Sequence, residues 1–322
     1  MRPTVSTGRS GVEQRRLGRA CTDSDAQPLS RRSFLTATAG AGAALCSFAS
    51  AAADDKEHGP LRIVTLDAAL TQTTLALGVS PVGVSGASFY RSFVIEPPLP
   101  SGVVDVGTRS EPNVELLLEI APDVILYSPE YGQLTRSLAD RIPTTPIAIY
   151  VPGSESYFEG ATLATEAVAE RLGRSAQAHR CIADANERVV SMRRILVAAK
   201  TRSVCVMSFL SSRIVRLYTR DSLFGGVLQA AGIRNVVAYE GNKWGFTDVG
   251  MAALAEYDAD LYVHIGAIPA RATVSPVWNA LPFVRQKRIV ALPTIWMFGG
   301  LPSATRFADG LAAAIGATDG TP

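Results

Sequence analysis

Apolar positions follow two different rhythms along this chain of 322 residues. Short continuous apolar runs, such as RIVTL at 62–66 and DVILYS at 123–128, are typical of strands buried on both faces. Longer runs with helical spacing stand between them, such as PNVELLLEIAP at 112–122, which has a proline near its start. The alternation from residue 62 to residue 150 predicts a parallel sheet covered by helices.

A long helical stretch interrupts this alternation, which then resumes. Residues 175–200 contain neither glycine nor proline, and Ser175 is placed to cap their start. At a rise of about 1.5 Å per residue the helix would span roughly 40 Å, which suits a helix that crosses between two lobes. Strand patterns follow at 203–209 and 213–219, and DVGMAALAEY at 248–257 has the pattern of a helix.

The pattern therefore predicts an α/β fold of two Rossmann-like lobes joined by a single long helix. We expect an N-terminal lobe over residues 60–174, an interlobe helix over 175–200 and a C-terminal lobe over 201–317. Cys181 falls in a helical pattern and Cys205 in a strand pattern, so both are predicted to be buried free thiols.

The first 53 residues have a different character. Arg31 and Arg32 precede a weakly apolar run that ends in Ala-Ser-Ala at 49–51. The run is too short and too rich in small residues for a membrane span. We interpret residues 1–53 as an N-terminal extension with a Tat-type signal peptide, which would place the mature protein in the periplasm. A disordered basic tail is the alternative, and lipoprotein anchoring through Cys46 is disfavoured because a bulky leucine precedes it.

The charge of the chain belongs mostly to this N-terminal segment. It carries seven arginines and three acidic residues, or +4, whereas the whole chain has a net charge of +2. The remainder is therefore at about −2, which gives no reason to expect a nucleic-acid partner.

Signatures of catalysis are scarce. No two of the three histidines lie at metal-ligand spacing, and the nucleophile-elbow, phosphate-loop and dinucleotide-binding motifs are missing from the sequence. We therefore expect neither an enzyme nor a metal centre.

Aromatic residues instead gather in four predicted loops that follow strand patterns. The segments are GASFYRSF at 86–93, LYSPEYG at 126–132, EGNKWGFTD at 240–248 and PTIWMFGG at 293–300. Open α/β sheets bind ligands at the carboxyl ends of their strands, and aromatic rings give a large apolar contact area. The four loops predict a ligand site, although Phe89 and Met297 are expected to pack into their own lobe instead.

Several spaced motifs in order resemble the family of periplasmic iron(III)-hydroxamate siderophore-binding proteins, the long-helix substrate-binding proteins of ABC importers. The motifs include DVGTRSEPNVELLLEIAPD, YSPEYG, NKWGFTDVGMAALAEY and IWMFGGLPSATRF, and the resemblance covers about residues 61–316. It implies two lobes bridged by a rigid helix, a shallow aromatic cleft and no cofactor. It also implies a monomer that delivers a ferric hydroxamate of the ferrichrome or coprogen type to an inner-membrane permease and its ATPase.

The resemblance also assigns roles to single residues. Arg109 and Tyr131 match the family residues that hydrogen-bond the iron-bound hydroxamate oxygens, and Asn242 matches one that reaches the ligand. Cleft aromatics are implied at Tyr127, Phe93, Trp244, Trp296 and Phe298. Acidic residues that dock to the permease are implied at Glu111 and Glu115 in the first lobe and at Asp248 and Glu256 in the second.

Other ligands and one other class of function stay open. Arg91 and Arg306 could add positive charge for a carboxylate-bearing ligand. A binder of haem would use an axial ligand such as Tyr131, and a binder of a cobalamin would have less need of Arg109. A siderophore-modifying hydrolase would need a nucleophile such as Ser128 or Ser303, but no histidine accompanies either serine.

Overall fold

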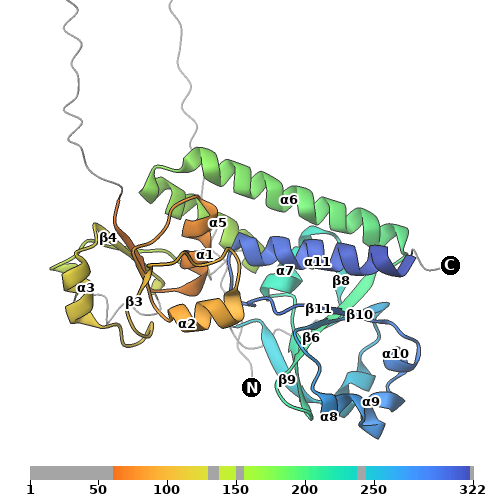
Figure 1. Cartoon of the computed structure of the whole chain (residues 1–322). Coiled ribbons are helices and arrows are strands. Elements are labelled where there is room, and N and C mark those ends of the chain that lie inside the picture. Colours follow the sequence, from red (N-terminus) through yellow and green to blue (C-terminus); the bar gives the residue numbers. More distant parts are fainter. Residues whose placement is uncertain (1–60, 130–137, 150–155, 238–243, 320–322) are drawn as a thin grey trace, which may run out of the picture. The chain divides into compact units, whose positions relative to one another are not determined.

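The computed structural model describes residues 61–129, 138–149, 156–237 and 244–319 (Figure 1). Contacts divide the chain into a unit of residues 1–55 and a unit of residues 56–322, and every described residue belongs to the second. The predicted signal segment lies outside the described residues.

The first lobe is built on a five-stranded parallel sheet with the strand order β3-β2-β1-β4-β5. This confirms the parallel sheet that the apolar runs predict. Its strands are β1 (Ile63–Thr65), β2 (Gly83–Val84), β3 (Val104–Asp105), β4 (Val124–Tyr127) and β5 (Thr144–Pro146). Its helical elements are α1 (Ala68–Ala76), α2 (Ala87–Phe89), the π-helical turn η1 (Tyr90–Val94), α3 (Val114–Ile120) and α5 (Tyr157–Leu172).

The second lobe contains a mixed sheet with the order β11-β10-β6-β7-β9, and β8 also pairs with β6. β7 runs antiparallel to both of its neighbours. The strands are β6 (Ser203–Phe209), β7 (Ile214–Tyr218), β8 (Arg234–Asn235), β9 (Phe246–Gly250), β10 (Leu261–Ile265) and β11 (Ile289–Leu292). The helical elements are α7 (Leu223–Ala230), the 3-10 helix η3 (Met251–Glu256), α8 (Ala270–Thr273), α9 (Pro276–Ala280), α10 (Pro282–Arg285) and α11 (Leu301–Asp319).

The helix predicted over 248–257 is wrong in its first part. Residues 248–250 belong to β9, and a 3-10 helix follows them. β9 pairs with β7 along its whole length, from Phe246 opposite Tyr218 to Gly250 opposite Ile214. This ladder of backbone hydrogen bonds overrides the helical spacing of the sequence.

The long helix of the sequence pattern is α6 (Ser175–Ala198), which connects the elements of the two lobes. Arg174, not Ser175, occupies its N-cap position, and no side chain caps that end. The 19-residue helix α11 packs along α6 (Figure 1). Among the described residues, no helix is long and apolar enough to cross a membrane.

Alternating strand residues supply separate parts of the core, as the two-residue period of a strand requires. Ile63, Val124 and Val204 point into one large cluster that also takes in α1, α5, α6, α7 and α11. Their neighbours Ile125 and Cys205 point the opposite way, into two smaller clusters, one for each lobe. We call the large cluster the shared core, because both sheets contribute to it.

Candidate functional site

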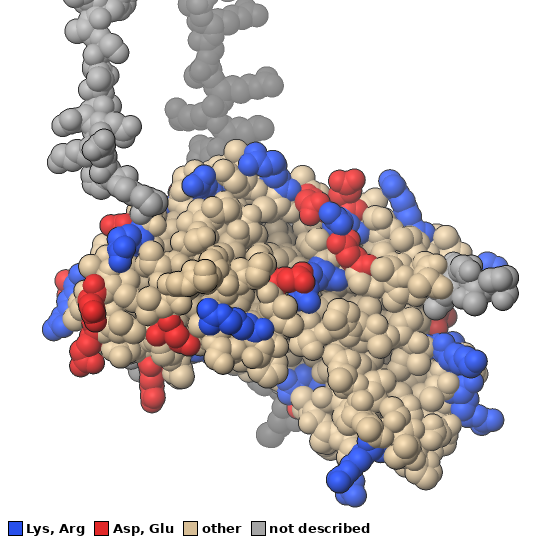
Figure 2. Space-filling model, viewed as in Figure 1, with Lys and Arg blue, Asp and Glu red and all other residues tan. Residues whose placement is uncertain are grey.

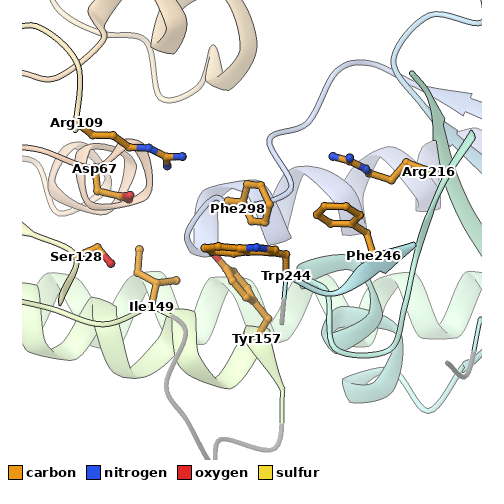
Figure 3. Close-up of a pocket in the computed structure, with 9 residues that line it drawn as sticks. All are labelled: Asp67, Arg109, Ser128, Ile149, Tyr157, Arg216, Trp244, Phe246 and Phe298. Carbon is orange, nitrogen blue, oxygen red and sulfur yellow. The ribbon is translucent and has the colours of Figure 1, made fainter. Parts of the chain in front are cut away.

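A pocket of about 230 Å³, which we call the arginine pocket, lies where the two lobes meet (Figure 3). Four of its lining residues follow the carboxyl ends of parallel strands in the first lobe, where open α/β sheets place ligands. A fifth begins α5, and four come from the second lobe. They are Asp67, Arg109, Ser128 and Ile149, then Tyr157, then Arg216, Trp244, Phe246 and Phe298.

Asp67 is placed by the start of α1. Its carboxylate caps the helix by accepting hydrogen bonds from the backbone N–H groups of Ala69 at 2.8 Å and Leu70 at 3.4 Å. Burial is the largest influence and raises the pKa of Asp67 above its ordinary value, although these two hydrogen bonds and the nearby charge of Arg109 lower it. The pocket therefore holds an acidic side chain near Arg109 whose charged form is disfavoured by burial.

Arg109 sits on a tight turn between β3 and α3. Gly107 has φ 91°, and its backbone pairs with Pro112 in an isolated bridge. A Cβ atom at Gly107 would lie 3.0 Å from the backbone oxygen of Glu111, so both the conformation and the space favour glycine. Asp105 accepts a hydrogen bond from Gly107 N–H at 3.0 Å. The turn thus directs the guanidinium of Arg109 into the pocket (Figure 3).

The opposite wall is aromatic and carries a second guanidinium. The Arg216 Cζ atom lies 3.6 Å from the centre of the Phe246 ring, which is a cation–π distance. Phe298 makes edge contacts with Trp244 at 5.9 Å and with Trp296 at 5.2 Å between ring centroids. In Figure 3 the guanidinium groups of Arg109 and Arg216 point toward one another from opposite walls.

A second hollow of about 290 Å³ shares Arg109 with the arginine pocket. Phe89 and Trp296 line it, and their rings meet edge to face at 4.8 Å. Phe93 stacks on Phe89 at 5.0 Å and is 49% exposed. These phenylalanines stand on α2 and η1, so the expectation of a loop at 86–93 is wrong.

The expectation that Phe89 packs into its lobe is also wrong, because 38% of this residue is exposed and it lines the second hollow. Met297 is 6% exposed within the shared core, which confirms the corresponding expectation for that residue.

The remaining predicted ligand contacts fall into two groups. Tyr131 and Asn242 lie outside the described residues. Tyr127 is partly buried and packs against the smaller apolar cluster of the first lobe, the one that contains Ile125.

The acidic residues predicted for permease docking differ in their surroundings. Glu111, Glu115 and Glu256 are exposed, and Figure 2 shows acidic side chains gathered at the α3 end of the first lobe. Asp248 instead pairs with Arg216, with distances of 2.8 Å and 3.0 Å between nitrogen and oxygen. The docking roles stay predictions.

Arg306 acts between segments and not in the arginine pocket. It donates to the backbone oxygens of Val94 at 3.0 Å and Thr294 at 3.2 Å, and it pairs with Glu96 at 3.3 Å. Ser303, considered above as a nucleophile, is fully buried and bonds to the side-chain oxygen of Gln72 at 3.1 Å. Arg91 is exposed on η1.

The sequence reasoning missed Asp67, Ile149, Tyr157 and Arg216 as pocket residues. Asp67 could have been found, because it follows β1 directly and precedes a helix. The signal for Arg216 was a charged residue within an otherwise apolar strand pattern, which is unusual at the centre of a sheet.

The arrangement is suited to binding a bulky ligand that is rich in oxygen atoms. Two arginines offer several N–H donors, and aromatic rings offer apolar contact. Among the described residues, no group of three or more histidine, cysteine, aspartate or glutamate side chains could hold a metal ion.

The chain is similar to characterised proteins over most of its length. It is 34% identical over 261 residues to the iron(3+)-hydroxamate-binding protein FhuD of Escherichia coli K12, covering 80% of this chain and 88% of that protein. It also resembles the Fe3+–Desferal-bound siderophore-binding protein FhuD from Vibrio cholerae, with a TM-score of 0.74 and 25% identity over 80% of this chain and 98% of that one.

The same fold also occurs with another ligand chemistry. The Bacillus subtilis triscatecholate siderophore-binding protein FeuA, solved with ferri-bacillibactin, matches with a TM-score of 0.61 and 18% identity over 79% of this chain and 92% of that one. The family described as periplasmic binding protein matches residues 63–295. These matches confirm the resemblance seen in the motifs, and the chain belongs to the periplasmic binding protein family.

Proposed function

We propose that this protein captures ferric hydroxamate siderophores in the arginine pocket and delivers them to an inner-membrane ABC permease for iron uptake. The observation that carries the proposal is the pair of guanidinium groups that face one another across a pocket with one aromatic wall. A ferric tris-hydroxamate has no net charge, but its iron-bound oxygens carry partial negative charge. Arginine N–H groups can bind such oxygens, and aromatic rings can hold the siderophore backbone.

Relatives support the hydroxamate class and the non-enzymatic role. The relative from Escherichia coli is named for binding iron(3+)-hydroxamate, and the siderophore-binding protein from Vibrio cholerae was solved with Fe3+–Desferal bound. The iron is cargo within the siderophore, so the protein needs no iron ligand of its own. Export by the Tat-type signal, a periplasmic location and a monomeric state belong to the same proposal.

Tryptophan fluorescence tests the proposal directly. Of the three tryptophans in the chain, Trp244 and Trp296 line the two hollows, whereas Trp278 is buried in the outer cluster of the second lobe. Ferrichrome should quench the emission by energy transfer and contact. Trp244→Phe should remove much of the quenching, and Trp278→Phe should preserve it. Quenching by haem or a cobalamin but not by ferrichrome or coprogen would contradict the proposal.

Arg109→Ala should weaken ferrichrome binding about 10- to 100-fold, because hydrogen bonds to a charged donor contribute about 1.5–3 kcal/mol. Arg141→Ala is the matched control, since Arg141 is exposed and does not line either hollow. The dissociation constants come from the same fluorescence titration. Equal affinities for the two variants would remove Arg109 from the binding site.

A further inference from the structure

Arg216 is held in place by a carboxylate and by an aromatic ring. It lies on β7 directly opposite Asp248 on β9, and the antiparallel register brings the two side chains together. Its Nε atom donates to one carboxylate oxygen of Asp248 at 2.8 Å, and its Nη2 atom donates to the other at 3.0 Å. The Phe246 ring supports the flat guanidinium at 3.6 Å. This bidentate geometry fixes the orientation of the group.

Part of the guanidinium is left to face the pocket. The Nε atom and one edge of Nη2 are occupied by Asp248. Among the described residues, Nη1 makes its only hydrogen-bond contact with the sulfur atom of Met297, at the long distance of 3.9 Å. A guanidinium has five N–H donors, so the pair leaves donors that point toward Arg109 (Figure 3).

We propose that Arg216 is a second hydrogen-bonding anchor for the ligand and that Asp248 masks its charge, so that the site selects ferric complexes without net negative charge. This inference rests on the proposed function. Arg216 can donate to ligand oxygens, while its positive charge is balanced by a carboxylate that is 35% exposed and does not line the pocket. Asp67 lines the facing wall together with Arg109. The pair of Arg216 and Asp248 therefore brings donors to the site with little excess positive charge.

The physical consequence is that loss of Asp248 and loss of Arg216 should change the affinity for an anionic complex in opposite directions. Without the Asp248 carboxylate, the charge of Arg216 is exposed at the wall and attracts an anionic complex. Without the Arg216 guanidinium, the Asp248 charge is exposed and repels it. A charge about 8 Å from the ligand in a medium of intermediate dielectric changes affinity by about fivefold.

The test uses three ferric complexes with the same iron centre. Ferrioxamine B carries one ammonium group, its N-acetyl derivative is neutral and its N-succinyl derivative carries one carboxylate. Asp248→Asn should improve binding of the succinyl form relative to the acetyl form by about fivefold. Arg216→Met should weaken all three complexes and shift the same ratio in the opposite direction. Both are measured by fluorescence titration at low salt and again at high salt, where the shifts should shrink.

Asp258→Asn is the matched control, because Asp258 also pairs with an arginine in the second lobe but is 95% exposed in its side chain. The ratio of its affinities for the succinyl and acetyl forms should equal that of the wild type. A purely structural role of the pair would move all three affinities together, and unchanged ratios in both single variants would overturn the inference. If the wild-type protein binds neither these complexes nor ferrichrome, the proposed function itself fails, which is a different result from unchanged ratios.

Discussion

His264 is a fully buried imidazole near the end of β10, beside the ring of Phe209 at 5.5 Å. Burial lowers its pKa to about 4 from an ordinary value of 6.5. The unfolded chain therefore takes up a proton at a higher pH than the folded protein. The stabilising contribution of the neutral ring is complete above pH 6.5 and decreases as the pH falls toward 4.

We expect the free energy of unfolding to fall by about 2–3 kcal/mol between pH 7 and pH 4.5 on account of His264. His264→Leu removes the titrating group and should flatten this part of the pH dependence, as measured by urea denaturation. His179 is exposed on α6, so His179→Gln should keep the wild-type slope. Equal slopes for all three proteins would show that His264 does not control the acid sensitivity.

Single residues also show what sequence patterns can and cannot predict about a site. Arg109 and Trp244 were predictable because each follows or precedes a strand pattern in a motif with a specific resemblance. The charge of Arg216 within an apolar strand pattern is a sequence signal, but its place in the pocket was not predictable, because that place depends on the antiparallel pairing of β7 with β9. A strand pattern gives the faces of a strand but not its partner or its direction.

At the scale of elements, helix starts follow local capping chemistry in some places but not in others, since no side chain caps α6 at the predicted Ser175. Asn113 and Ser156 cap α3 and α5 by accepting backbone hydrogen bonds at 3.0 Å and 3.2 Å. The boundaries of η3 and η1 were not predictable, because local helical spacing competes there with sheet pairing and with the packing of Phe89 and Phe93. Long-range contacts decide such short segments.

Two glycines in helices of the second lobe, one near the start of α7 and one near the end of α11, offer a matched pair of substitutions. A Cβ atom at Gly225 in α7 would meet the backbone oxygen of Thr219 and lie 2.5 Å from Cα of Arg220. Gly225→Ala should therefore destabilise the protein by about 1–3 kcal/mol. Nothing lies within 4 Å of the corresponding position at Gly316 in α11, so Gly316→Ala should stabilise by about 0.5–1 kcal/mol.

Chemical denaturation of both variants measures this difference. The intrinsic helix propensity of alanine is the same in each case, so opposite signs isolate the effect of space around the glycine. A stabilising Gly225→Ala would mean that the turn before α7 can move away without loss.

At the scale of the whole described part of the chain, polar contacts reinforce the shared core. The side-chain oxygen of Gln72 on α1 accepts hydrogen bonds from Gly300 N–H at 3.0 Å and from Ser303 at 3.1 Å, and its nitrogen donates to the backbone of Glu96. The buried Gln72 thus joins the first lobe to the start of α11. Breaking these bonds during a large hinge motion would leave buried polar groups without partners.

We therefore expect little closure when a ligand binds. Small-angle scattering of the protein with and without ferrichrome should give the same radius of gyration within error. A Gln72→Ala variant should bind with similar affinity but show a larger ligand-dependent change, because it lacks the side chain that joins the lobes. A marked compaction of the wild-type protein on binding would contradict this view of the interface.

The shared core also limits how this architecture can be recombined. Side chains from both sheets pack on α6 and α11 in one apolar cluster, so each lobe completes the interior of the other. The residues at the strand ends can vary to suit a new ligand without disturbing that interior. The lobes themselves are not exchangeable modules, because a chimera with halves from two relatives would bring together packing surfaces that had not changed in concert.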